Sequence, residues 1–507
     1  NKHWYKTLFA DGHQSATDPE FNNLIYAETQ QGGLHRIDLV TGEQTFVQPQ
    51  AGINDPHERF NWDAPILVSP HDPSTIYFAS YRVWKSENRG DDWNPISEDL
   101  TRNESRIELP IMGRKQSYDN AWDMKAMSEY NTITSLSESR LKEGLIWVGT
   151  DDGHIHVTIN GGESWKNIPV TKLGLAERTF VNDIKADLYD ENTVYVSLDN
   201  HKEGYLSPYL FKSDDLGESW ESISNNIPDR NLVWRFVQDH VNKDLFFLAT
   251  EFGIYTSLDA GKNWQKLPGS PTISFRDIVI QERENDLVGA SFGRGFFVLD
   301  DYSALRKINS ETMEKDAFIF EPRKALQYNQ VSGGTTSDGM SSYYAKNPRY
   351  GANIKYYVKE SEATLRSKRI ARESFRGVDL NAVEALIMSG YENPRSLLNE
   401  DINDVAENSG LSKSEIKDIV LVIKNNLKTG VNIAFPGWEQ LDAEINEDYA
   451  KALIVIKDNN GNKIEEISRP LRRGVNEVNW DLTKDIVTTI NSGSSYSSGL
   501  NRWVEPG

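Results

Sequence analysis

The sequence predicts a mainly β protein: a β-propeller of six or seven blades, followed by an Ig-like β-sandwich that a small helical insertion interrupts. A strand-like unit recurs at steps of 52, 70, 48, 52 and 41 residues through the first three hundred residues. A Gly-and-Trp turn motif follows this unit four times in the same register. Beyond it, a hairpin pattern and further strand patterns flank a run of amphipathic helices. Short strands at such a period indicate propeller blades.

The composition narrows the function classes. The 507 residues include no cysteine, which excludes disulfides, thiolate nucleophiles and cysteine-based zinc sites. The net charge of −21 disfavours nucleic-acid binding, because an acidic surface repels phosphates. No apolar run is long enough to predict a membrane span. The start without Met and the turn-like Pro506-Gly507 end lead us to expect that both ends are cuts in a longer chain.

Each repeat unit begins with a polar turn, continues with four or five apolar residues, and closes with a small or hydroxyl residue. The apolar runs are rich in aromatic and β-branched residues, which favour strands. The closing residues are Ala27, Ala79, Gly149, Ser197, Ala249 and Ala290.

The second half of the unit is a turn of the form Ser/Thr-x-Asp/Asn-x-Gly-x-x-Trp. We expect the Asp or Asn to accept hydrogen bonds from turn amides, the Gly to take a positive φ, and the Trp to pack over the hairpin. This role is structural and not catalytic. The four copies are Ser86, Asn88, Gly90 and Trp93; Thr158, Asn160, Gly162 and Trp165; Ser213, Asp215, Gly217 and Trp220; and Ser257, Asp259, Gly261 and Trp264.

These turns are similar to Asp-boxes, and segments such as FLATEFGIYTSLDAGKNW and GASFGRGFFVLDD resemble the sortilin-like, BNR-repeat proteins of bacteria, often labelled glycosyl-hydrolase-like. The resemblance implies that these residues form the second of two propellers. It also implies that a β-sandwich follows them and that the other propeller lies upstream. We therefore expect an Asp-box propeller over 1–310, a linker and first sandwich strands over 311–361, a helical insertion over 362–430, and the remaining, truncated sandwich over 431–507.

The insertion is predicted to contain several short helices. Asp379 is expected to cap one, Ser412 and Glu415 to form a capping box for another, and Gly390 and Gly410 to end the helices before them. The block resembles helix-hairpin-helix or SAM-like modules. Nine acidic against six basic residues between 375 and 430 argue against nucleic-acid binding. A protein-docking role and a purely stabilising role both remain open.

Several constellations could carry chemistry. Carboxylates follow the inner strands at Glu28, Asp151, Asp152, Asp199 and Glu251, and a glycosidase needs two of them facing one cleft. The alternative is that these polar residues only line the solvent-filled mouth of the propeller. A sialidase is disfavoured because the Arg-Ile-Pro motif of that family is absent: Arg106-Ile107 is followed by Glu108. His154 and His156 share a strand face, but no third histidine is placed near them, so no metal and no cofactor are predicted.

The preferred interpretation is a non-catalytic extracytoplasmic scaffold or binding protein at the bacterial cell surface, the outer membrane or the periplasm. Its partner would be a protein or peptide of the envelope, or a glycan, within a larger envelope complex. In the alternative, a glycoside hydrolase acts on polysaccharide between this and an upstream propeller, with Asp151, Asp152, Asp199 and Glu251 as catalytic candidates. A third hypothesis makes the inserted helices a tether. The expected binding residues are Tyr81, Arg82, Asp151, Asp152, Asp199, Glu251, Phe252 and Arg294.

Overall fold

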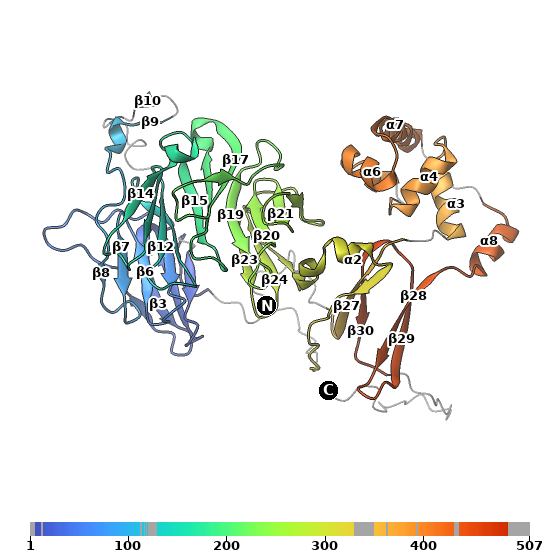
Figure 1. Cartoon of the computed structure of the whole chain (residues 1–507), viewed down its shortest axis with the longest axis horizontal. Helices are drawn as coiled ribbons and strands as arrows, with labels where there is room; N and C mark the ends of the chain where they lie inside the picture. The colour runs from blue at the N-terminus through green and yellow to red at the C-terminus, as the bar shows by residue number, and fades with distance from the viewer. Residues whose placement is uncertain are drawn as a thin grey trace. The chain divides into compact units, whose positions relative to one another are not determined.

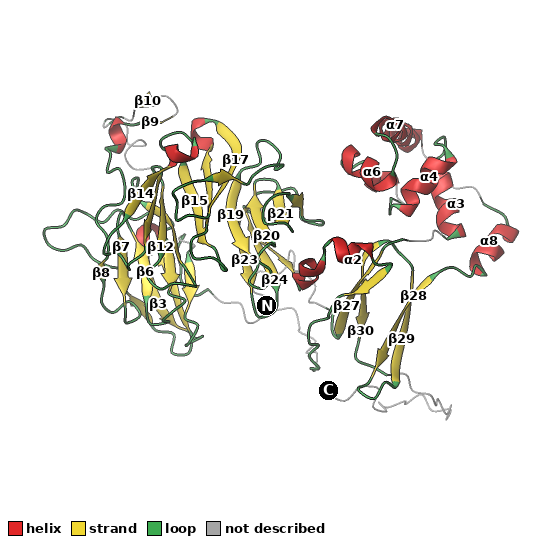
Figure 2. Cartoon of the chain, viewed as in Figure 1, coloured by secondary structure: helices red, strands yellow, loops and turns green. Residues whose placement is uncertain are grey.

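The computed structural model describes residues 6–11, 14–111, 114–115, 117, 119, 129–328, 349–360, 364–391, 394–429 and 435–484. The chain divides after Arg306 into two compact units, which are described separately (Figures 1 and 2).

The first unit contains antiparallel sheets that follow one another along the chain, and each sheet is a simple meander. Sheet 1 consists of β1 (Ser15–Thr17), β2 (Leu24–Thr29), β3 (Gly33–Asp38) and β4 (Gln44–Phe46). Sheet 2 consists of β5 (Ile66–Val68), β6 (Ile76–Ala79), β7 (Val83–Ser86) and β8 (Asn94–Pro95). Sheet 3 consists of β11 (Ile133–Glu138), β12 (Ile146–Thr150), β13 (His154–Thr158) and β14 (Lys166–Pro169).

The later sheets keep the same order of strands. Sheet 4 consists of β15 (Phe180–Ala186), β16 (Val194–Asn200), β17 (Tyr205–Ser213) and β18 (Glu221–Ser222). Sheet 5 consists of β19 (Val233–Gln238), β20 (Phe246–Thr250), β21 (Gly253–Ser257) and β22 (Gln265–Lys266). Sheet 6 has three strands, β23 (Phe275–Gln281), β24 (Asp286–Ser291) and β25 (Phe296–Leu299).

Short elements occupy the connections between these strands. A two-stranded ribbon, β9 (Pro110–Ile111) with β10 (Arg114–Lys115), lies in the long loop before sheet 3. The 3₁₀ turns are η1 (Gln30–Gly32), η2 (Arg106–Glu108), η3 (Val170–Leu173), η4 (His201–Glu203) and η5 (Tyr302–Lys307).

Successive sheets contact one another through their first strands, from β1 and β5 through β11, β15 and β19 to β23. The first strands are therefore the inner ones, and the fold is propeller-like, as the period predicted. The apolar core is divided into layers between neighbouring sheets. In one layer Tyr195 of sheet 4 stacks on Phe236 of sheet 5 with ring centroids 4.4 Å apart, and Phe246 packs edge-on against both.

The four repeat turns share one pattern of hydrogen bonds among the Ser or Thr hydroxyl, the Asp or Asn side chain and turn amides. The sequence predicted the amide bonds to the Asp or Asn. In the last copy, Ser257 Oγ donates to Asp259 Oδ1 at 2.8 Å, and the Gly261 amide donates to Ser257 Oγ at 2.9 Å. The Asn263 amide donates to the same Asp259 oxygen at 2.9 Å. Gly261 has a φ of +84°, which a side chain rarely tolerates. Trp264 then donates from Nε1 to the Ile223 carbonyl at 2.7 Å and so joins the turn to the preceding connection.

The second unit contains a three-stranded sheet with the order β26 (Ala317–Ile319), β27 (Ala352–Val358) and β30 (Gly474–Trp480), and a hairpin of β28 (Lys451–Lys457) and β29 (Lys463–Pro470). The expected hairpin turn is present: Asp458 Oδ1 accepts from the Asn462 amide at 2.8 Å. Ile354, Ile454 and Val478 form a shared apolar core between the sheet and the hairpin.

Helices separate β27 from β28. They are α3 (Leu365–Ser374), α4 (Leu380–Met388), α5 (Pro394–Leu397), α6 (Ile402–Ser409), α7 (Lys413–Thr429) and α8 (Trp438–Ile445). One more short helix, α2 (Ser310–Glu314), precedes β26. The predicted caps are present: Asp379 accepts from the first amides of α4, Ser412 and Glu415 exchange two hydrogen bonds, and Gly410 ends α6 with a φ of +70°. The sequence did not predict α8, which extends the helical part beyond residue 430.

The two ends of the insertion are joined by polar contacts. Arg369 of α3 forms a bidentate ion pair with Glu444 of α8, at 2.6 and 2.9 Å. The amide of Leu365 donates to the Glu447 carboxylate at 2.8 Å. The hydrogen bond from Arg369, followed by that from Gln440, lowers the pKa of Glu444 to about 2. The stabilisation from this pair is present above the ordinary glutamate pKa and is lost as the pH falls through about 2.

Replacing Glu444 by Gln should loosen the contact between α3 and α8, because the ion pair and its bidentate geometry are lost. We expect faster hydrogen exchange of the amides of both helices at pH 7, and a smaller difference between variant and wild type as the pH approaches 2. Equal exchange rates at pH 7 would show that the pair contributes nothing to the closure.

Replacing Trp264 by Phe should destabilise the first unit by about 1–2 kcal/mol beyond the loss of ring volume, because the buried Ile223 carbonyl loses its donor. Trp220→Phe is the matched control, since the described residues offer Trp220 Nε1 no hydrogen-bond partner. Chemical denaturation of both variants measures the difference, and equal losses would contradict the assigned bond.

Candidate functional site

The meander topology places two sets of connections on one face of the first unit. The turns between the second and third strands of each sheet lie at the same end as the loops that lead into the next sheet. We call this the loop face. The repeat turns lie at the opposite end of the strands. The turn residues of the loop face include Gln31, Tyr81, Arg82, Asp151, Asp152, His201, Glu251, Phe252, Phe292 and Arg294, together with Asp199 at the end of β16.

A β-bulge recurs near the start of the inner strand in sheets 3 to 6. Each time the pairing register shifts by one residue, which leaves one residue of the inner strand without a partner. Bulges redirect a side chain and are common next to functional sites. The bulged residues are Thr134, Asn182, Trp234 and Arg276.

The first two bulged residues bond each sheet to the next one. Thr134 Oγ1 donates to the Val181 carbonyl at 2.7 Å, and Asn182 Nδ2 donates to the Val233 carbonyl at 3.1 Å. In the last pair, the contact is between side chains: the Arg276 guanidinium lies 3.6 Å from the centroid of the Trp234 ring. The bulges therefore fix the inner strands to one another at the level of the loop face.

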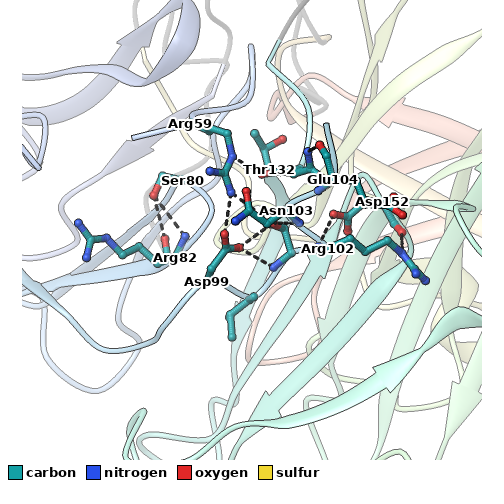
Figure 3. Close-up of polar contacts among 12 residues, drawn as sticks. Arg59, Ser80, Arg82, Asp99, Arg102, Asn103, Glu104, Thr132 and Asp152 are labelled. Atoms are coloured by element: carbon teal, nitrogen blue, oxygen red, sulfur yellow. Dashed lines mark hydrogen bonds and ion pairs between the residues drawn. The ribbon is translucent and has the colours of Figure 1, made fainter. Parts of the chain in front are cut away.

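A polar cluster between sheets 2 and 3 holds the long connection in place (Figure 3). Arg59 donates to Asp99 at 2.8 Å, and the Arg102 amide donates to Asp152 Oδ2 at 2.7 Å. Arg102 Nε also donates to the Asp152 carbonyl at 2.7 Å. Glu104 is held next to this cluster by Arg178, at 2.7 Å. These ion pairs and hydrogen bonds hold Asp99, Arg102 and Glu104 of the connection between β8 and β11 in place.

Asp151 and Asp152 are neighbours in the chain and both are buried. Asp151 accepts from the amide and the hydroxyl of Thr132 at 2.9 and 2.7 Å. Asp152 accepts from Thr150 Oγ1 at 2.6 Å and from the Arg102 amide. Burial and then the charge of Asp152 raise the pKa of Asp151 to about 8, and burial also raises that of Asp152. With both oxygens of each carboxyl bonded to protein, the pair serves the architecture of the loop face better than it serves a substrate.

Tyr81 and Arg82 are also engaged. Tyr81 is buried beneath the guanidinium of Arg59, 4.5 Å from its ring centroid. Arg82 forms ion pairs with Asp55 at 2.8 Å and with Glu58, and its guanidinium lies 4.5 Å from the Trp84 ring. Both residues therefore support a wall of the loop face instead of projecting from it.

Asp199 and Glu251 form a second group of carboxylates, around Trp234. His201 Nδ1 is hydrogen-bonded to Asp199, and the His201 ring packs edge-on against Trp234 at 5.6 Å. Glu251 Oε2 accepts from Trp234 Nε1 at 3.1 Å and from Ser274 Oγ at 3.0 Å. Both carboxylates act electrostatically on Arg276. Sheets 4, 5 and 6 thus contribute to one polar group, and Glu251 is less buried than Asp151, Asp152 or Asp199.

Exposed aromatic rings lie beside this group. Phe252 directly follows Glu251 and is 44% exposed, and Phe292 is 73% exposed with Arg276 lying 5.2 Å from its centroid. Arg294 lies in the β24–β25 turn, where its amide donates to Ser291. Trp234, Ser274 and Arg276 were not predicted. Bulges, which leave no mark in the strand pattern, bring Trp234 and Arg276 to the loop face, and Ser274 lies in the loop just before β23.

Glu28 is buried on sheet 1, apart from this group. Burial, followed by the charge of Asp63, raises the pKa of Glu28 to about 9. It is a neutral acid of the interior at physiological pH.

Each histidine of the pair has a hydrogen-bond partner in the protein. His154 contacts Asn167 at 2.7 Å and His156 contacts the Leu100 carbonyl at 2.7 Å. Within the described residues no group of three or more metal-ligating side chains comes together.

The helices of the described segments are all too short or too polar to cross a membrane.

Comparison with known proteins adds independent information. No family model matches the sequence. A stretch of 217 residues is 24% identical to an oligoxyloglucan-reducing end-specific xyloglucanase of Emericella nidulans, covering 43% of this chain and 24% of that protein. A probable oligoxyloglucan-reducing end-specific xyloglucanase of Neosartorya fischeri is 22% identical, with 43% of this chain and 23% of that protein covered. The match thus spans about a quarter of these relatives.

A comparison with solved structures also gives matches. The GH74 xyloglucanase from Xanthomonas campestris matches with a TM-score of 0.40 and 16% identity, over 57% of this chain and 43% of that chain.

The two sequence relatives overturn the prediction of a non-catalytic scaffold, because both are named xyloglucanases. That prediction rested on the sortilin-like resemblance, on the interpretation of the carboxylates as residues that only line the propeller mouth and on the structural role of the repeat turns. These turns lie at the opposite end of the strands from the carboxylates, so they carry no information about chemistry on the loop face. The alternative prediction, a glycoside hydrolase, is the better supported of the two.

The raised pKa of Asp151 implies a stability that depends on pH. Its stabilising contribution is greatest below the ordinary aspartate pKa and declines as the pH rises through about 8. We expect the free energy of unfolding of wild type to fall between pH 5 and 8 relative to that of Asp151→Asn.

Asp215→Asn is the control, because the hydrogen bonds of its turn lower the pKa of Asp215 to about 2, and its contribution is constant over this range. Urea denaturation at each pH gives the free energies. Parallel curves for wild type and Asp151→Asn would contradict the assignment.

Proposed function

We propose that the first unit is part of a glycoside hydrolase that binds and cleaves a β-linked polysaccharide of the xyloglucan type on its loop face. The observation that carries the proposal is the pair of carboxylates, Asp199 and Glu251, on adjacent turns around Trp234. Glycosidases of most families need two carboxyl groups flanking the scissile bond. The names of the two fungal relatives support the substrate class.

The surroundings of the pair support this chemistry. Exposed Phe252 and Phe292 offer apolar ring faces beside the carboxylates, and binding sites commonly combine such surfaces with a few convergent polar groups. Arg276 balances the negative charge, which lets two acidic side chains occupy one site without mutual repulsion dominating.

We assign different roles to the two carboxylates. Both hydrogen bonds to Glu251 end on Oε2, which fixes the carboxylate in one orientation. Its other oxygen is the one we assign to a water molecule or to the sugar. Asp199 is assigned to the proton transferred to the leaving oxygen, with His201 holding its orientation. Asp151 and Asp152 are assigned to support of the loop face.

The finer fold assignments belong to the same proposal. We infer that the repeat turns are Asp-boxes of a sortilin-like or BNR-type propeller with six or seven blades. The strands β26 to β30 would belong to an Ig-like β-sandwich, and the protein would act outside the cytoplasm, where such polysaccharides are found.

Replacing Glu251 by Gln or Asp199 by Asn should each lower kcat/KM on xyloglucan by about 100-fold or more, equivalent to about 3 kcal/mol of transition-state stabilisation. The full chain is incubated with the polymer, and released reducing ends are counted. The matched control is Glu163→Gln, an exposed carboxylate in a repeat turn on the opposite face, which should retain full activity.

Thermal unfolding verifies that each variant is folded. Absence of reducing-end release by wild type, or full activity in folded Glu251→Gln and Asp199→Asn variants, would refute the proposal.

A further inference from the structure

A second polar hollow lies on the loop face, between sheets 1 and 2. It has a volume of about 180 Å³. Its polar lining residues are Gln31, Gln48, Gln50, His57, Glu58 and Glu129, and its apolar ones are Pro49, Ala51 and Phe60. About six water molecules occupy this volume in liquid water. It therefore suits one small ring or side group and not a stretch of polymer. None of these residues belongs to the Asp199–Glu251 group.

One wall of the hollow is rigid. Glu58 is only 7% exposed, and it accepts hydrogen bonds from Ser80 Oγ at 2.5 Å, Arg82 Nε at 2.8 Å and Trp84 Nε1 at 3.3 Å. A buried charge held by three donors keeps one position. Because Arg82 and Asp55 complete the network, the wall exists before any ligand arrives.

The opposite side is formed by a strained turn. Gln31 has φ of 59° and ψ of 41°, the left-handed conformation that non-glycine residues rarely adopt. The next residue, Gly32, lies so close to Phe60 that a Cβ would come within 2.4 Å of its ring. The turn thus packs tightly against Phe60, and Gln31 and Phe60 both line the hollow.

The lining selects the chemistry of a ligand. Three primary amides and an imidazole can both donate and accept hydrogen bonds, whereas the carboxylates of Glu58 and Glu129 only accept when ionised. The described lining contains no lysine or arginine, and its two carboxylates repel anions. An apolar ligand would leave these groups unpaired, at a cost. A cation would find the charge of Glu58 already paired with Arg82. The lining therefore favours a neutral molecule with many hydroxyl groups.

We infer that this hollow binds one neutral sugar ring, a branch or terminal residue of a polysaccharide engaged on the same face. The identity of that polysaccharide rests on the proposed function, whereas the selection of a neutral sugar rests on the hollow alone. Its side chains contribute to binding and do not touch the reacting atoms.

The test is a calorimetric titration of the full chain carrying Glu251→Gln, which is expected to slow turnover about 100-fold or more, with a xyloglucan-derived oligosaccharide. Adding Gln48→Ala and Gln50→Ala should weaken binding about tenfold, the loss expected from one or two hydrogen bonds. Adding Gln265→Ala, an exposed glutamine of β22 outside the hollow, should leave the Kd unchanged. In the active protein the paired change should raise KM and leave kcat unaltered.

The outcomes separate the two proposals. An unchanged Kd and KM in the paired variant overturns the sugar hollow and leaves the hydrolase standing. Binding that depends on Gln48 and Gln50 in a protein that releases no reducing ends supports the hollow and overturns the hydrolase. Absence of any heat of binding, together with absence of turnover, overturns both.

Discussion

The lateral bonding of neighbouring sheets at their inner strands is the constraint on which the loop face depends. Sheets of four short strands cannot bury both faces alone, so each uses the next sheet as its partner. The bulged residues reinforce this packing at one end, through Thr134 to Val181 and through Asn182 to Val233. The same irregularity, repeated in later sheets, carries Trp234 and Arg276 to the Asp199–Glu251 group. The β-bulges thus serve both the packing of neighbouring sheets and the placement of the candidate site residues.

The sequence was sufficient where the determinants are local. The repeat turns, the capped helices and the hairpin at Asp458 depend on residues within a few positions of one another, and the structure confirms them. The carboxylates were also recognisable as a set, because equivalent positions of a meander reach the same face. The strands that they end or follow were predicted to be the inner ones, but they are the second strands of their sheets. Their individual environments were not, since those depend on bonds to distant segments such as the one that Asp152 receives from Arg102.

The missed residues have a common physical origin. A bulge adds one residue without disturbing the apolar pattern, so Trp234 and Arg276 read as ordinary strand positions. The sugar hollow joins residues from two loops and the β2–β3 turn, and no spacing rule connects Gln31 with Glu129. The non-catalytic interpretation failed for a related reason: the most conspicuous motif in the chain lies at the end of the strands opposite the candidate site.

The ion pair between Arg369 and Glu444 has a consequence for how the helical insertion is tolerated. An unstructured connection between β27 and β28 would carry the entropy of closing a very long loop. Here the insertion's first and last helices are fastened together, and its own apolar core around Leu386 and Ile423 is independent of the strands. To the sheet, the insertion is equivalent to a short connection. Such a module can be gained, lost or exchanged in evolution while the register of the strands on either side stays as it was.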